Sequence, residues 1–143
     1  MVHYPPIIVQ QNFKVSCSRL WLAISEAEEM RQWYFPMIPE FRTELGFSTR
    51  FTVEVEDRVF PHLWQVTQVK PEQLLAYNWQ FEGYPGKGSS SFQIDPDKDG
   101  CTLTLRFEVS EPFPDDIPEF KRESGVQGWN YLIGESLVAY LKN

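Results

Sequence analysis

The feature that most constrains the fold is a period of two: between residues 51 and 109, apolar and polar side chains alternate. Phe51, Val53 and Val55, for example, are separated by Thr52 and Glu54. Because successive side chains of a strand point to opposite faces of a sheet, each such segment buries one face and exposes the other. Short turns rich in Gly, Pro and Asp, at residues 83–88 and 95–100, predict an antiparallel meander. The alternation returns in four further segments: His62, Trp64 and Val66; Leu75, Tyr77, Trp79 and Phe81; Phe92 and Ile94; Leu103, Leu105, Phe107 and Val109.

A sheet with one apolar face needs another element to cover that face. The longest proline-free stretch ends the chain, after a Pro-rich connector at residues 111–118. Its apolar residues lie three or four positions apart, which is the stripe of an amphipathic helix: Val126, Trp129, Ile133, Leu137 and Tyr140. We therefore predict a long closing helix that packs Trp129, Ile133 and Leu137 against the sheet.

The first forty residues add a strand and two short helices. Residues 7–15 are extended in character, and Ser16 can cap a helix that follows them. Ser25-Glu26-Ala27-Glu28 has the form of a capping box, which predicts the start of a second helix, and Pro36 and Pro39 end this region. The whole order predicts one α+β domain over residues 1–143, a helix grip in which a curved antiparallel sheet wraps around the C-terminal helix.

Several motifs, in this order and spacing, resemble the activator of heat-shock protein 90 ATPase homologue family, within the START-like (SRPBCC, helix-grip) superfamily. The match covers nearly the whole chain. It rests on these pieces: Leu20-Trp21-x-x-Ile24-Ser25-x-x-Glu28 with Trp33-Tyr34; Val69-x-Pro71-x-x-x-Leu75-x-Tyr77-x-Trp79 with Gly83-Tyr84-Pro85-Gly86; and Gly100-x-x-Leu103-Thr104-Leu105 with Phe113-Pro114, Phe120 and Gly128-Trp129.

The chain departs from the family pattern at two points. Gly100-Cys101 stands where the family usually shows Gly-Thr, a small change. The eukaryotic co-chaperone also carries a separate amino-terminal domain that does much of the chaperone binding, and 143 residues leave no room for it. The resemblance therefore implies the fold of the other domain rather than activation of a chaperone.

The charge and the cysteine content limit which binding partners and which cellular location the sequence favours. A formal charge of −7, with no run of Lys or Arg, argues against a nucleic-acid or membrane partner. The amino terminus lacks the features of a signal peptide, and no apolar run approaches the ~18 residues of a membrane span. Cys17 and Cys101 lie in no metal or redox motif, so we expect two buried free cysteines and a cytoplasmic location.

The candidate catalytic and metal motifs are incomplete. His3 and His62 are too few and too isolated for a metal site, so we expect no metal and no cofactor. Glu54 and Glu56 lie on the polar face of a strand, where solvation is the simpler interpretation. Residues 86–89 imitate a phosphate loop and residues 95–99 imitate a calcium loop, but both lie in hairpin turns without the helix that each motif requires.

Aromatic residues are the most unusual feature, with 11 Phe, 6 Tyr and 5 Trp. Many of them must form the core, yet a helix grip leaves room for a gap between sheet and helix that an apolar ligand could fill. Trp33, Tyr34 and Trp64 are predicted to line one cavity, because the first two follow the second helix and the third lies on the apolar side of a strand. The full set of predicted cavity residues is Trp33, Tyr34, Phe35, Phe41, Phe51, His62, Trp64, Tyr77, Trp79, Phe92, Phe107, Trp129 and Ile133.

The sequence thus favours a non-enzymatic START-like domain that binds a small hydrophobic molecule between sheet and closing helix. Two alternatives remain open. One is a co-chaperone or protein-interaction module whose partner is a chaperone or another protein. The other is a cyclase-like or hydrolase-like enzyme, which would need polar groups that converge inside the cavity, with His62 as the candidate base.

Overall fold

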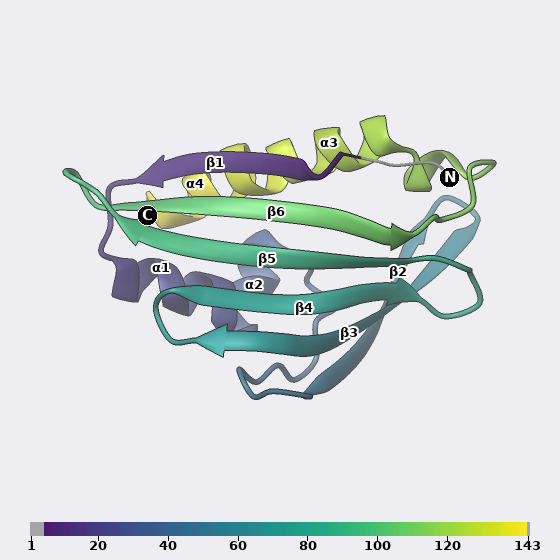
Figure 1. Cartoon of the computed structure of the whole chain (residues 1–143), viewed down its shortest axis with the longest axis horizontal. Helices are drawn as coiled ribbons and strands as arrows, with labels where there is room; N and C mark the ends of the chain where they lie inside the picture. The colour runs from purple at the N-terminus through teal and green to yellow at the C-terminus, as the bar shows by residue number, and fades with distance from the viewer. Residues whose placement is uncertain (1–4, 143) are drawn as a thin grey trace.

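The computed structural model describes residues 5–142, so His3 lies outside the described residues. Six antiparallel strands form one sheet in the order β1-β6-β5-β4-β3-β2. Figure 1 shows the helices behind this sheet, with the closing helix running from the end of β6 back towards the turn between β5 and β6. The predicted α+β helix grip is confirmed. The strands are β1 Ile7–Phe13, β2 Ser48–Val55, β3 Arg58–Lys70, β4 Leu74–Phe81, β5 Lys87–Pro96 and β6 Cys101–Glu111.

Two short helices follow β1, as predicted. The first, α1 Cys17–Ser25, is capped by Ser16, whose hydroxyl accepts a hydrogen bond from the Arg19 amide at 3.1 Å. The predicted capping box is wrong, because the second helix, α2 Ala27–Trp33, begins after Glu26 and has no side-chain cap. The Ser25 hydroxyl instead donates back to the Trp21 carbonyl within α1. The first strand ends at Phe13, two residues before the predicted boundary.

The closing helix is longer and less regular than its apolar stripe indicates. It consists of α3 Arg122–Tyr131, one π-helical turn η2 Leu132–Ser136, and α4 Leu137–Leu141. Trp129, Ile133 and Leu137 are buried, which confirms the predicted side of the helix. Trp129 contacts rings on three strands of the sheet: Trp79 of β4, Phe92 of β5 and Phe107 of β6. None of the helices within residues 5–142 is long and apolar enough to cross a bilayer.

The two cysteines are a correction to the sequence interpretation. Cys17, at the start of α1, and Cys101, at the start of β6, form a disulfide, with Cα atoms 5.3 Å apart. They are 84 positions apart in the sequence and belong to no known motif, so spacing alone could not pair them. The disulfide ties α1 to the start of β6, the strand next to the β1 edge of the sheet.

Candidate functional site

A cavity of about 980 Å³ lies between α3 and the nearby end of the sheet. Its lining is mostly apolar and comes from β1, β2, β3, β4 and β6, from the segment after α2, and from α3. The volume lies at the upper end of the roughly 300 to 1,000 Å³ range of small-molecule pockets. The cavity therefore has the size and the chemistry to accept an apolar organic ligand.

Three aromatic rings form a continuous inner wall of this cavity. Trp79 of β4 lies 5.8 Å from Phe107 of β6 and 5.6 Å from Trp129 of α3, between ring centroids. Phe107 and Trp129 are 6.0 Å apart. All three residues line the cavity, and Trp79 and Trp129 are nearly buried from bulk water. A ligand in the cavity would contact these rings directly.

Residues 112–121, here called the strap, join β6 to α3 and close one side of the cavity. The strap contains a short 3-10 helix, η1 Pro118–Phe120, and both Phe113 and Phe120 line the cavity. The Phe120 ring lies 4.8 to 5.5 Å from four others: Phe60, Phe81, Tyr84 and Phe113. Apolar contacts of this kind hold the strap down on the ends of β3 and β4.

An ion pair holds the strap as well. Arg58, the first residue of β3, donates two hydrogen bonds to the Glu119 carboxylate, from Nε at 2.9 Å and from Nη2 at 2.6 Å. These hydrogen bonds lower the pKa of Glu119 from its ordinary value. The turn between β4 and β5 also fits the strap: Gly86 has a φ of 113°, and a Cβ there would lie 2.9 Å from the Phe113 Cα. Only glycine can occupy that position without displacing the strap.

His62 of β3 supplies the buried polar side chain of the cavity. It is 6% exposed and lies between aromatic rings, stacked on Phe51 at 4.8 Å and edge-on to Phe81 at 4.7 Å. Burial lowers the pKa of His62 to about 4, so the imidazole is neutral at pH 7. Its Nδ1 lies 2.9 Å from the carbonyl oxygen of Phe60.

Five of the thirteen predicted cavity residues line this cavity: Phe35, His62, Trp79, Phe107 and Trp129. The other eight belong to the packed core next to it: Trp33, Tyr34, Phe41, Phe51, Trp64, Tyr77, Phe92 and Ile133.

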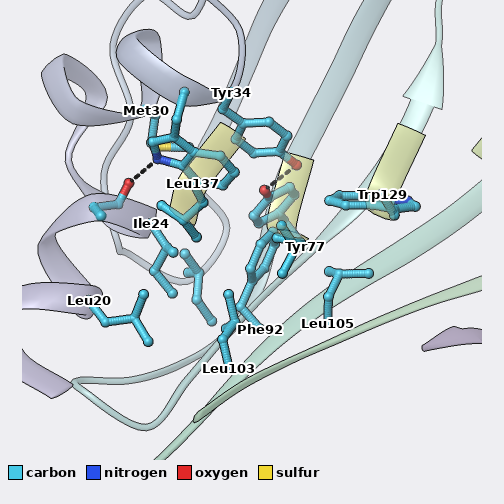
Figure 2. Close-up of a cluster of buried hydrophobic side chains, with 14 of the residues drawn as sticks. Leu20, Ile24, Met30, Tyr34, Tyr77, Phe92, Leu103, Leu105, Trp129 and Leu137 are labelled. Carbon is cyan, nitrogen blue, oxygen red and sulfur yellow. Dashed lines mark hydrogen bonds between the residues drawn. The ribbon is translucent and has the colours of Figure 1, made fainter. Parts of the chain in front are cut away.

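The three rings expected to share a cavity are packed on one another instead. Trp33 stacks on Tyr34 at 4.7 Å, and Tyr34 lies 5.3 Å from Trp64. None of the three lines the cavity. Hydrogen bonds also fix two of the three rings: the Trp33 indole donates to the Ala23 carbonyl at 2.7 Å, and the Tyr34 and Tyr77 hydroxyls lie 3.0 Å apart. Figure 2 shows this tyrosine pair inside the cluster and Trp129 to one side of it.

Several cavity residues were missed from the sequence. Phe113 and Phe120 entered only through the family resemblance, although Phe113 lies in the Pro-rich connector and Phe120 just after it, where an aromatic residue is harder to explain as core. Aromatic residues in an irregular segment drew attention to Trp33 and Tyr34, and the same criterion would have identified the strap as part of the site. Phe60 and Phe81 could not be separated from ordinary strand aromatics.

The other polar side chains that line the cavity lie on the strap and on α3: Asp115, Glu119, Lys121, Arg122, Glu123 and Gln127. Within residues 5–142, no cluster of three or more His, Cys, Asp or Glu side chains is arranged to hold a metal ion. The acids of the predicted polar face, Glu54 and Glu56, are exposed.

Residues 14–142 match the family described as "Activator of Hsp90 ATPase homolog 1-like protein". The chain belongs to this family. The match covers α1 to α4, and so includes the strap and all of the closing helix. It confirms the resemblance inferred from the motifs. No curated protein matches the sequence.

Solved structures show that this chain shares its helix-grip fold with bacterial proteins. Protein CV1439 from Chromobacterium violaceum is 17% identical, with a TM-score of 0.79, over 96% of this chain and 97% of that one. Protein BH1534 from Bacillus halodurans is 20% identical, with a TM-score of 0.75, over 99% of both chains. DynU16, from the dynemicin biosynthetic locus, is 20% identical, with a TM-score of 0.75, over 96% of this chain and 47% of that one.

Proposed function

We propose that this protein is a non-enzymatic, single-domain START-like binder of a small hydrophobic molecule, which it holds between the sheet and the closing helix. The observation that carries the proposal is the cavity of about 980 Å³, with its inner wall of Trp79, Phe107 and Trp129. Each buried CH₂ group of a ligand contributes about 0.8 kcal/mol, so ten carbon atoms suffice for micromolar affinity before the entropy of association is subtracted.

Binding is favoured over catalysis by the polar groups that meet the ligand. His62 is the buried ionisable side chain of the cavity, and its imidazole is bonded to a backbone carbonyl rather than to an acid or a nucleophile. General acid–base or nucleophilic catalysis needs a second group in reach of the first. We therefore expect no turnover of generic ester or phosphate substrates above background.

A neutral fluorescent probe, N-phenyl-1-naphthylamine, tests the proposal when it is titrated into the purified protein. Gly128 of α3 lines the cavity, and a Cβ at this position would meet no atom within 4 Å. Gly128→Leu should fill part of the cavity and weaken probe binding about tenfold, equivalent to about 1.4 kcal/mol. Gly134→Leu is the matched control, because Gly134 lies in the same closing helix but does not line the cavity. Failure of the wild-type protein to bind the probe, or equal effects of the two substitutions, would contradict the proposal.

The cytoplasmic location stays a prediction, since it rested on two free thiols and the structure joins them. Disulfides persist in oxidising compartments and are rare in the cytosol. Thiol labelling of acid-quenched cells decides the point. Reduced, labelled Cys17 and Cys101 would agree with the cytoplasm, and full protection from labelling would contradict it.

A further inference from the structure

The hydrogen bonding of His62 determines what kind of polar group the cavity can accept. The Nδ1 atom lies 2.9 Å from the Phe60 carbonyl oxygen, and a carbonyl oxygen can only accept a hydrogen bond. Nδ1 therefore carries the proton. A neutral imidazole has one N–H group, which leaves Nε2 with a lone pair and makes it an acceptor.

Nε2 opens onto the cavity. Within residues 5–142, Nε1 of Trp64 is the one fully buried side-chain nitrogen or oxygen without a hydrogen-bond partner. Nε2 of His62 also makes no hydrogen bond to these residues, but it is not among the fully buried atoms. It is therefore accessible, and because His62 lines the cavity, we take the cavity as the space that it faces. Rings on both sides fix the direction of the imidazole: Phe51 stacks on it at 4.8 Å, and Trp79 meets it at 5.4 Å.

Two of the residues that line the cavity also carry hydrogen-bond donors. The indole rings of Trp79 and Trp129 line the cavity 5.6 Å apart, and neither indole N–H donates to a residue in 5–142. The Trp79 ring is a direct neighbour of His62. The inner part of the cavity thus offers an acceptor beside a donor, within a wall that is otherwise apolar.

We infer that the cavity selects uncharged apolar molecules that carry a hydroxyl group, which donates its proton to Nε2 of His62. The inference rests on the proposed binding function. A hydroxyl group can donate to Nε2 and accept from an indole N–H at once, whereas an amide N–H can only donate. A carbonyl, ether or carboxylate oxygen would face the lone pair of Nε2 with another lone pair. An ammonium group would have to be buried as an unpaired charge, which is far more costly.

Three probes of similar size test the inference: 2-naphthol, 2-methoxynaphthalene and naphthalene. We expect 2-naphthol to bind the wild-type protein about tenfold more tightly than 2-methoxynaphthalene, as one buried hydrogen bond implies. His62→Phe keeps an aromatic ring on Phe51 but removes the acceptor, so it should lose the preference for 2-naphthol over 2-methoxynaphthalene. His62→Gln, whose amide oxygen is an acceptor, should keep part of the preference. Urea unfolding of each variant shows whether it is folded.

The wild-type protein alone gives a second measurement, which does not depend on any variant folding. The chain has two histidines, so the ¹⁵N resonances of His62 can be resolved in a two-bond imidazole spectrum. The Nε2 resonance should shift on addition of 2-naphthol and stay in place with 2-methoxynaphthalene. Equal affinities, an unshifted Nε2, or a preference that persists in His62→Phe would overturn this inference while probe binding still supported the proposed function. Absence of binding by all three probes would overturn both.

Discussion

The disulfide between Cys17 and Cys101 should carry a large share of the stability of this fold. It closes a loop over a sequence separation of 84 residues. The chain-entropy relation for cross-links then gives about 4.5 kcal/mol at 25 °C, from the lower entropy of the cross-linked unfolded chain. Domains of this size have total stabilities of about 5 to 15 kcal/mol. Reduction should therefore move the protein close to its unfolding threshold.

Urea unfolding at pH 7, followed by far-ultraviolet circular dichroism, measures this effect on the oxidised protein, the reduced protein and the double variant Cys17→Ala with Cys101→Ala. The reduced protein and the double variant should both lose about 4 kcal/mol in the free energy of unfolding. The mass of protein purified without reductant shows whether the disulfide has formed. Two free thiols in that sample, or a difference below about 1 kcal/mol between oxidised and reduced protein, would refute the reasoning.

Three further predictions follow from the site. Trp129→Ala should cost about 3 to 5 kcal/mol in urea unfolding, because it empties the space between α3 and rings on three strands, and a loss below about 1 kcal/mol would contradict the packing. The pKa of His62 is lowered to about 4, so the unfolded chain takes up a proton below pH 6.5 that the folded chain does not. The free energy of unfolding should therefore fall by about 3 kcal/mol more in the wild-type protein than in His62→Gln between pH 6.5 and 4. Parallel pH profiles of the two proteins would contradict this. Glu119→Gln should weaken the ion pair that holds the strap to Arg58, and should therefore speed probe dissociation several-fold in stopped-flow measurements. Glu123→Gln is the control, and equal dissociation rates in the two variants would contradict a closing role for the strap.

The sheet and its covering helix were predictable because each rests on a local pattern. The alternation around Phe51, Trp79 and Phe107 has the period of a strand, and the stripe from Val126 to Tyr140 has the period of a helix. Ser25 misled because its hydroxyl can act in two ways: as an N-cap it would accept a hydrogen bond from the Glu28 amide, but it donates to the Trp21 carbonyl within α1 instead. The π-helical turn at Leu132–Ser136 leaves the buried positions Ile133 and Leu137 unchanged, so the stripe carries no sign of it.

The cavity was harder to place, because composition indicates how many rings there are but not where the curved sheet leaves space. Trp33 ends α2 and Tyr34 follows it, and both rings are packed in the core on the side of the molecule where α2 contacts α4. The space opens instead towards α3, where Gly125 and Gly128 have no side chains to fill it. That difference depends on the distance between helix and sheet, which no local sequence pattern encodes. The pairing of Cys17 with Cys101 escaped prediction for the same reason.

The central claim is that the cavity under α3 binds a small apolar molecule. The NMR resonances of the indole N–H groups test this claim most directly. The protein has five tryptophans, and the cavity divides four of them into two pairs: Trp79 and Trp129 line it, whereas Trp33 and Trp64 are packed in the core. Titration of ¹⁵N-labelled protein with 2-naphthol, with resonances assigned by single Trp→Phe variants, reports on each ring separately. Our account predicts saturable shifts at Trp79 and Trp129 and nearly constant resonances at Trp33 and Trp64. Shifts confined to Trp33 and Trp64, or no shift in any indole up to the solubility limit of the probe, would contradict it.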